Sequence, residues 1–295
     1  MDIIFSSVAQ GLLWAILAIG VFMTYRVLDI ADLSAEGTFP LGAAVGVTLI
    51  VQGVPPVAAT ILAMVAGMLA GLIAGFLHTK MKIPALLTGI LMLTGLYSVN
   101  LRVLSNRANL SLAGQSTLMR TLQAAGISRL ASTAIVGTIA VGLVVVVLTW
   151  FFQTEVGLSL RATGNNEVMA EANSININLM KVLGYMLGNG LIALAGALIA
   201  QNNGYADVGM GTGTIVIGLA SVIISEVLFR PKKIAWHLLV ITIGSILYRL
   251  VIDLVLTLGV QPQDLKLFSA IVLALVLWLP EIKRLQGKEE DRSIK

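Results

Sequence analysis

Residues 129–152 read RLASTAIVGTIAVGLVVVVLTWFF, a run of 24 residues in which only the first side chain is charged. A helix needs about 20 predominantly apolar residues to cross the hydrocarbon core of a bilayer. Apolar runs of this kind recur along most of the chain, and the alternation of polar and apolar residues that is typical of strands is absent. The sequence therefore predicts an all-α, polytopic membrane bundle.

The composition supports the same class. The 295 residues are 57% hydrophobic and 12% charged, whereas soluble domains are roughly 45–50% apolar and about 25% charged. A chain of this size cannot bury so much apolar surface in one soluble core. This excludes a soluble enzyme, a nucleic-acid-binding protein and a disordered scaffold. The formal charge of +4 is interpreted as a topology signal, and the absence of cysteine excludes disulfides and thiol chemistry.

About nine spans are predicted, of which the second is short for a full crossing. We expect residues 1–280 to form a single transmembrane domain and residues 281–295 to form a charged cytoplasmic tail. The predicted spans are 7–27, 39–52, 55–78, 84–101, 129–152, 181–201, 212–229, 236–257 and 264–280.

The basic residues predict the orientation of these spans, because cytoplasmic segments are enriched in Lys and Arg. With the 153–180 segment placed inside the cell, thirteen Lys and Arg residues fall on the cytoplasmic side and five on the outer side, and Arg249 lies within a span. The N-terminus is then outside and the C-terminus inside. The outer segment 102–129 weakens this assignment, because it carries four arginines.

Glycines at four-residue spacing predict close contacts between helices. Gly67, Gly71 and Gly75 lie on one face of the third span, and Gly42 and Gly46 lie on one face of the second. Small residues at this spacing let helix backbones approach closely in lipid. We assign these glycines to packing and not to a binding site.

No catalytic machinery is predicted in this chain. A phosphate-binding loop of the form Gly-x-x-x-x-Gly-Lys-Ser/Thr is absent. The two histidines, His78 and His237, lack the spacing of metal ligands and are expected to anchor the chain at the membrane interface. We therefore expect no catalytic residue, metal or cofactor here.

Charged residues inside the spans are informative because burying them in a membrane is costly. Glu226 precedes Arg230 by four residues, and Arg249 precedes Asp253 by four, so each pair shares a helix face and can neutralise itself. A structural ion pair is the favoured interpretation, and a role in the substrate path is the alternative.

A polar break separates the first two spans. Asp32, Ser34 and Glu36 lie in this break, which spans residues 29–38. Broken helices at membrane depth commonly line binding sites. Two interpretations stay open: the segment forms a cavity wall, or it is an ordinary cytoplasmic loop.

The polar segment 153–180 is the strongest functional signal. Asn165 or Asn166 can cap a helix by accepting a backbone N–H, and Glu167 suits the positive end of its dipole. A helix over 167–172 is predicted, which ends at the Asn- and Ser-rich stretch that follows. So short a helix is marginal alone, so we expect it to dock against a partner; a solvated loop is the alternative.

These residues carry a resemblance. The pattern Arg161-Ala-x-Gly164-x-Asn166-x-x-x-Ala170, followed by Ile175-Asn176 and later by Gly190-x-x-Ala-Leu-Ala-Gly196, resembles the coupling loop and next helix of ABC importer permeases of the branched-chain amino acid and ribose type. Residues 11–20 resemble the first helix of that group. Residues 26–33, 78–84, 204–211, 218–224 and 244–249 are more similar to a less-characterised branch associated with tryptophan and tyrosine uptake.

The resemblance covers nearly the whole chain and implies a function. The chain would be the translocation subunit of an importer in the bacterial plasma (inner) membrane, moving a small organic solute inward by alternating access. The implied partners are a cytoplasmic ABC ATPase that binds ATP and Mg²⁺, an extracytoplasmic substrate-binding protein, and a second copy of the chain or a related permease. The segment that would couple to the ATPase contains Arg161, Gly164, Asn165, Asn166, Glu167, Val168, Met169, Ala170, Glu171 and Ala172.

Ser174 departs from the resemblance, because related permeases usually have Gly before Ile-Asn. We expect Asn173 to take the left-handed turn conformation there instead.

The substrate path is predicted from polar and aromatic residues at helix breaks and outer helix ends. The alternative function is an ion- or proton-coupled secondary transporter, in which Glu226, Arg249 and Asp253 would be the coupling charges. The predicted path residues are Asp32, Ser34, Glu36, Tyr97, Asn100, Tyr205 and Asp207.

Overall fold

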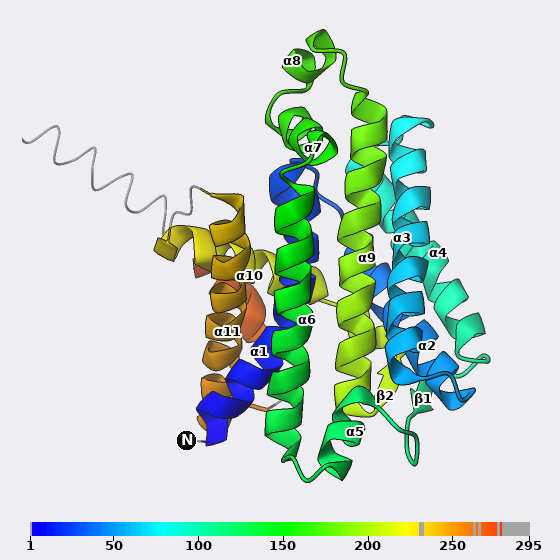
Figure 1. Cartoon of the computed structure of the whole chain (residues 1–295), viewed down its shortest axis with the longest axis vertical. Coiled ribbons are helices and arrows are strands. Elements are labelled where there is room, and N and C mark those ends of the chain that lie inside the picture. The colour runs from blue at the N-terminus through cyan, green and yellow to red at the C-terminus, as the bar shows by residue number, and fades with distance from the viewer. Residues whose placement is uncertain (1, 230–232, 262–263, 265–266, 276–277, 279–295) are drawn as a thin grey trace, which may run out of the picture.

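The fold is an elongated helical bundle with one short two-stranded ribbon, seen in a computed structural model (Figure 1). The structure describes residues 2–229, 233–261, 264, 267–275 and 278. The elements are α1 (Asp2–Phe22), the π-helical turn η1 (Met23–Val27), α2 (Ala35–Val51), α3 (Pro56–Thr79), α4 (Ala85–Val103), β1 (Asn109–Ser111), α5 (Leu118–Ala124), α6 (Arg129–Phe151), α7 (Glu155–Asn165), α8 (Glu167–Ala172), α9 (Ile177–Asn203), β2 (Tyr205–Asp207), the 3₁₀ turn η2 (Val208–Gly211), α10 (Thr214–Phe229) and α11 (Ile234–Thr257).

Seven helices among the described residues are long and apolar enough to cross a membrane. They coincide with seven of the predicted spans. The second predicted span corresponds to α2, which has 17 residues, whereas the shortest of the seven candidate spans has 19. The ninth predicted span, 264–280, lies partly outside the described residues. Arg230 and the tail 281–295 lie entirely outside them. The structure thus confirms a polytopic helical membrane protein.

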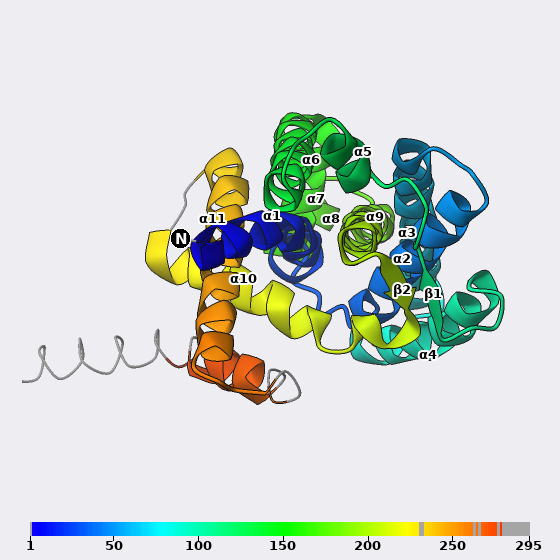
Figure 2. The same ribbon diagram turned by 90° about the horizontal axis from the view of Figure 1, so that it is seen from below.

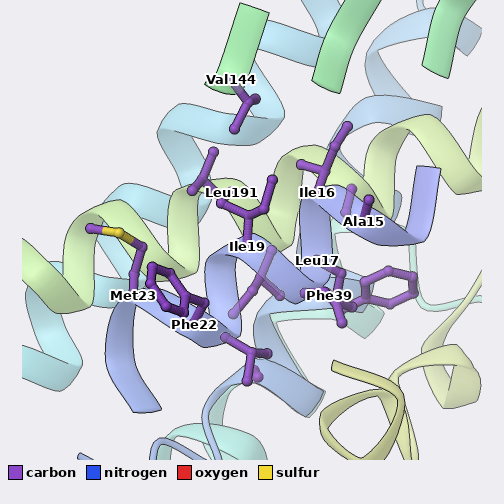
Figure 3. Packing of buried hydrophobic residues seen from close by; sticks show 14 of the residues in the cluster. Ala15, Ile16, Leu17, Ile19, Phe22, Met23, Phe39, Val144 and Leu191 are labelled. Atoms are coloured by element: carbon purple, nitrogen blue, oxygen red, sulfur yellow. The ribbon is translucent and has the colours of Figure 1, made fainter. Parts of the chain in front are cut away.

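Helix α9 forms the centre of the bundle. It packs against α1, α2 and α3, and Figure 2 shows it end-on among its neighbours. The core beside it is apolar: Figure 3 shows Ile16, Ile19 and Phe22 of α1 with Leu191 of α9 and Val144 of α6. Helix α9 therefore provides the central packing surface for α1, α2 and α3.

The predicted glycine contacts are confirmed at the centre. A methyl group added to Gly71 of α3 would lie 2.3 Å from the carbonyl oxygen of Tyr185. One added to Gly42 of α2 would lie 2.0 Å from the carbonyl oxygen of Ala193. The backbones of α2 and α3 therefore touch α9 directly, as small residues allow in membranes.

The ends of the bundle differ in their elements. The N-terminus, α5 and the β1–β2 ribbon lie at one end, and α7 and α8 project from the other (Figure 1). In the ribbon, Asn109 pairs with Asp207 and Ser111 with Tyr205, in antiparallel register. The sequence pattern does not predict these two strands, each of which has three residues.

Helix α10 runs across the bundle and not along it. Figures 1 and 2 both show it lengthwise, while α6 and α9 are lengthwise in the first view and end-on in the second. The apolar segment 212–229, which the sequence predicts to span the membrane, therefore forms a helix. Its axis is not parallel to the axes of α6 and α9.

Candidate functional site

The short helix α8 has the bounds that the sequence predicts, Glu167–Ala172. Its N-cap is Asn166, whose side-chain oxygen accepts the backbone N–H of Met169 at 3.0 Å. Asn165 instead ends α7, a helix that the sequence analysis did not predict. Val168 and Met169 expose 76% and 60% of their surface, so α8 presents apolar side chains at the end of the bundle.

Glu167 and Ala170 of this segment make contacts within the chain. Glu167 forms an ion pair with Lys181 of α9 at 2.8 Å, so it already has a cationic neighbour, while Ala170 is buried. Arg161, Glu171 and Ala172 are exposed. These contacts anchor α8 to the start of α9 and leave its apolar face uncovered by the described residues.

Gly164 connects α7 to the end of the first span. A methyl group there would lie 1.8 Å from the carbonyl oxygen of Val27 in η1. A side chain at position 164 would therefore obstruct the close approach of α7 to η1. The predicted exit from α8 is wrong in one detail: Ser174 has the positive φ of 61°, while Asn173 has a φ of −92°.

The break between η1 and α2 is buried beside α9. Asp32 exposes 4% of its surface and Ser34 none. The Asp32 carboxylate accepts hydrogen bonds from the backbone N–H of Ser34 and from Nδ2 of Asn189, both at 2.9 Å. The hydroxyls of Ser34 and Thr38 donate to Oδ1 of Asn189 at 3.0 and 2.7 Å. These side chains thus form an internal polar cluster, while Asp29 and Ala31 of the same segment are exposed.

The start of α10 lies against this break. Oε1 of Glu36 accepts the backbone N–H of Gly213 at 2.9 Å, and a methyl group on Gly211 would lie 1.9 Å from the carbonyl oxygen of Glu36. Two irregular segments far apart in the sequence therefore meet inside the bundle. Irregular backbone at membrane depth is tolerated where protein or a water-filled cavity covers it.

The remaining predicted path residues are dispersed. Nδ2 of Asn100 donates to the carbonyl oxygen of Gly37 at 3.2 Å, which joins α4 to α2. Oδ1 of Asp207 accepts the backbone N–H of Gly209 and so begins η2. Tyr97 is exposed on α4 and Tyr205 on β2. The seven residues therefore lie in several separate elements, and Tyr205 lines a cavity that is described below.

One predicted charge pair is confirmed, and the other includes a residue that lies outside the described residues. Nε of Arg249 lies 3.2 Å from Oδ1 of Asp253, and Oδ2 of Asp253 accepts the hydroxyl of Ser7 at 2.7 Å. Among the described residues, Glu226 lies 2.9 Å from Nε of Arg26 and 3.2 Å from Nε2 of His237. Its carboxylate therefore joins α10 to η1 and α11, whereas the predicted partner, Arg230, lies outside the described residues.

Two cavities share Trp14 and Arg249. The larger, about 390 Å³, has a polar lining, and the smaller, about 210 Å³, is mostly apolar. The sequence analysis singles out only Tyr205 and Arg249 among their lining residues, because the others come from several elements and form no local pattern. The larger cavity is lined by Gln10, Leu13, Trp14, Arg129, Ile199, Asn202, Asn203, Tyr205 and Arg249. The smaller is lined by Trp14, Thr212, Gly213, Val216, Ile217, Ser245, Tyr248, Arg249, Ile252 and Ser269.

The apolar helices, the broken segments in the core and the projecting helix α8 together define a membrane transport subunit. Residues 3–278 match the family described as the permease component of branched-chain amino acid transport systems, and the chain belongs to this family.

Similar proteins agree with this assignment. The chain is 38% identical to a tyrosine transport system permease protein of Clostridioides difficile (strain R20291), covering 92% of this chain and 90% of that protein. It is 34% identical to an uncharacterized protein of Rickettsia prowazekii (strain Madrid E), covering 94% and 97%. Its fold is similar to that of an inward-facing ABC transporter assigned to the metal-chelate type, with a TM-score of 0.50, 14% identity, and coverage of 95% and 85%. The chain is therefore a multi-pass permease of the ABC transporter class in the inner membrane.

Proposed function

We propose that this permease imports an amino acid by alternating access, driven by ATPase subunits that dock on α8. ATP and Mg²⁺ would bind to those partners. A second permease copy or a related chain would complete the pathway, and an extracytoplasmic binding protein would deliver the solute. The N-terminus would lie outside and the C-terminus inside, with the ninth span formed by 264–280.

The observation that carries this proposal is the position of α8 at one end of the bundle with Val168 and Met169 exposed. Exposed apolar side chains outside the membrane are unfavourable in water unless a partner covers them. The contact of Gly164 with Val27 gives α8 and α7 a rigid connection to the first span. A displacement of α8 would therefore reach the transmembrane helices.

Replacing Met169 by Asp tests the docking. We expect copurified ATPase to fall at least about tenfold, because an unpaired carboxylate would enter an apolar contact. Met81→Asp is the matched control: Met81 is 58% exposed and lies beyond the end of α3. Uptake by the complex in proteoliposomes should fall with ATPase binding for Met169→Asp only. Full ATPase retention and uptake in Met169→Asp would overturn the proposal.

The solute class is supported by the relatives. The Clostridioides difficile protein is named as a tyrosine transport permease, and the description of the family refers to the transport of branched-chain amino acids. We therefore expect uptake of amino acids that requires ATP and persists after the proton gradient is collapsed. Uptake that ceases when the gradient is collapsed, with ATP present, would favour the secondary transporter. The pairing of Arg249 with Asp253 and of Glu226 with Arg26 favours structural roles for the charges that such a transporter would use.

A further inference from the structure

The larger of the two adjoining cavities has a basic lining. Arg129 and Arg249 supply guanidinium groups, and the described residues around it contribute no carboxylate. Asn202 and Asn203 add carboxamides from the end of α9. Guanidinium groups bind carboxylates through two parallel hydrogen bonds. This cavity is therefore suited to the anionic group of a solute.

Arg249 is held in place for such a contact. Asp253 pairs with its Nε, and Ser7 holds the other oxygen of that carboxylate. Because Arg249 lines both cavities, its guanidinium can contact a carboxylate at the boundary between them.

The smaller cavity has the chemistry of a side-chain pocket. Val216, Ile217 and Ile252 give it an apolar wall, and Trp14 and Tyr248 add aromatic rings. The indole of Trp14 stacks on Phe39, with ring centroids 5.5 Å apart and planes 15° from parallel. A ring held by stacking on one face offers a fixed surface to a second flat group.

We propose that the two cavities form one binding site for an amino acid with an aromatic side chain, in which Arg249 binds the carboxylate and Trp14 contacts the ring. This inference rests on the proposed import of amino acids and names the site and the part of the solute that each residue recognises. Gly213, which lines the smaller cavity, also donates its backbone N–H to Glu36. A bound side chain would therefore contact the segment that joins α10 to the central break.

Competition binding tests the site with the full-length permease in lipid nanodiscs. The probe is radiolabelled tyrosine, displaced by tyramine, which keeps the ring but lacks the carboxylate, or by alanine, which lacks the ring. We expect the unmodified protein to prefer tyrosine at least about tenfold over each competitor. The double variant Arg249→Gln/Asp253→Asn removes both charges of the pair together, and it should bind tyrosine and tyramine alike. Trp14→Leu should lose most of the preference over alanine and keep the preference over tyramine.

Arg102→Gln is the control, because Arg102 is an exposed arginine on α4 and does not line either cavity; it should bind like the unmodified protein. Tyrosine binding with an unchanged preference over tyramine in the double variant would overturn this inference and leave the proposed import intact. Uptake of tyrosine by the assembled transporter, without any binding to the permease, would also overturn it. Absence of amino acid uptake by the assembled transporter would remove the proposed function and the site together.

Discussion

At the scale of single residues, Asn189 is the hub of the buried polar cluster. Its carboxamide donates to Asp32 and accepts from Ser34 and Thr38, so one side chain of α9 fixes the break before α2. A buried polar group that loses its partner costs about 1–3 kcal/mol. The cluster therefore determines whether the broken segment stays in its position.

Replacing Asn189 by Leu should lower the stability of the permease by several kcal/mol, because Asp32 and the Ser34 hydroxyl lose a partner together. The measurement is the thermal unfolding midpoint in detergent. Thr94→Val is the control, since Thr94 is exposed and its hydroxyl donates only within its own helix, to Ile90. A midpoint for Asn189→Leu equal to that of the control would show that the cluster contributes little; the milder Asn189→Ser serves if the Leu variant does not fold.

Replacing Gly164 by Ala should separate α7 from η1, because the added methyl group would meet the Val27 carbonyl. Overpacking of this kind costs about 1–3 kcal/mol. We expect ATP hydrolysis by the assembled transporter to persist while uptake per ATP falls. Gly142→Ala in α6 meets nothing within 4 Å and should leave both rates unchanged. Equal uptake per ATP in the two variants would exclude Gly164 from the connection.

At the scale of elements, the connection from α8 to α9 depends on Ser174. Its φ of 61° lies in the left-handed region, which costs a residue with a side chain about 1–2 kcal/mol. Ser174→Gly should therefore raise stability by about 1 kcal/mol, and Ser174→Val should lower it by more, because β-branched residues fit this region poorly. Thermal unfolding and limited proteolysis between α8 and α9 measure both changes. Slower proteolysis of the Val variant would contradict this account.

The direction of α10 shows where sequence reasoning ends. Its apolar run meets the length criterion for a span. Length and composition indicate that a helix is buried in an apolar environment, but they do not indicate its direction. Contacts at its two ends hold it across the bundle: Gly213 bonds to Glu36 just before the helix begins, and Glu226 pairs with Arg26 near its end. Both contacts join segments distant in the sequence, which no local pattern contains.

Helix α8 was predictable because its signals are local. Asn166 as a cap, Glu167 in the first turn and the polar stretch after Ala172 all lie within ten residues of one another. The two cavities are the opposite case, since α1, α6, α9 and α11 each contribute one or a few lining residues. Trp14 in isolation looks like an ordinary residue of an apolar helix, and only the packing of α1 beside α11 places it with Arg249.

At the scale of the whole molecule, the two proposed sites lie toward opposite ends. Helix α8 projects from one end, and the larger cavity is lined by Arg129 at the start of α6 and by Asn202 near the end of α9, at the other. An importer requires this separation, because the solute enters from outside while the ATPase acts from the cytoplasm. The proposal for α8 and the proposal for the cavity therefore require the same orientation in the membrane.

Labelling of single cysteines tests that orientation without background, since the chain contains no cysteine of its own. We expect Ala125→Cys, just after α5, to react with a membrane-impermeant maleimide in intact cells, and Val168→Cys in α8 to react only after permeabilisation. Both positions are exposed, so accessibility in the folded chain does not distinguish them, and only the side of the membrane does. The excess of basic residues on the side of α8 supports this result. The reverse labelling pattern would place α8 outside the cell, where no ATPase could reach it, and would overturn both the docking site and the placement of the larger cavity toward the outer end of the bundle.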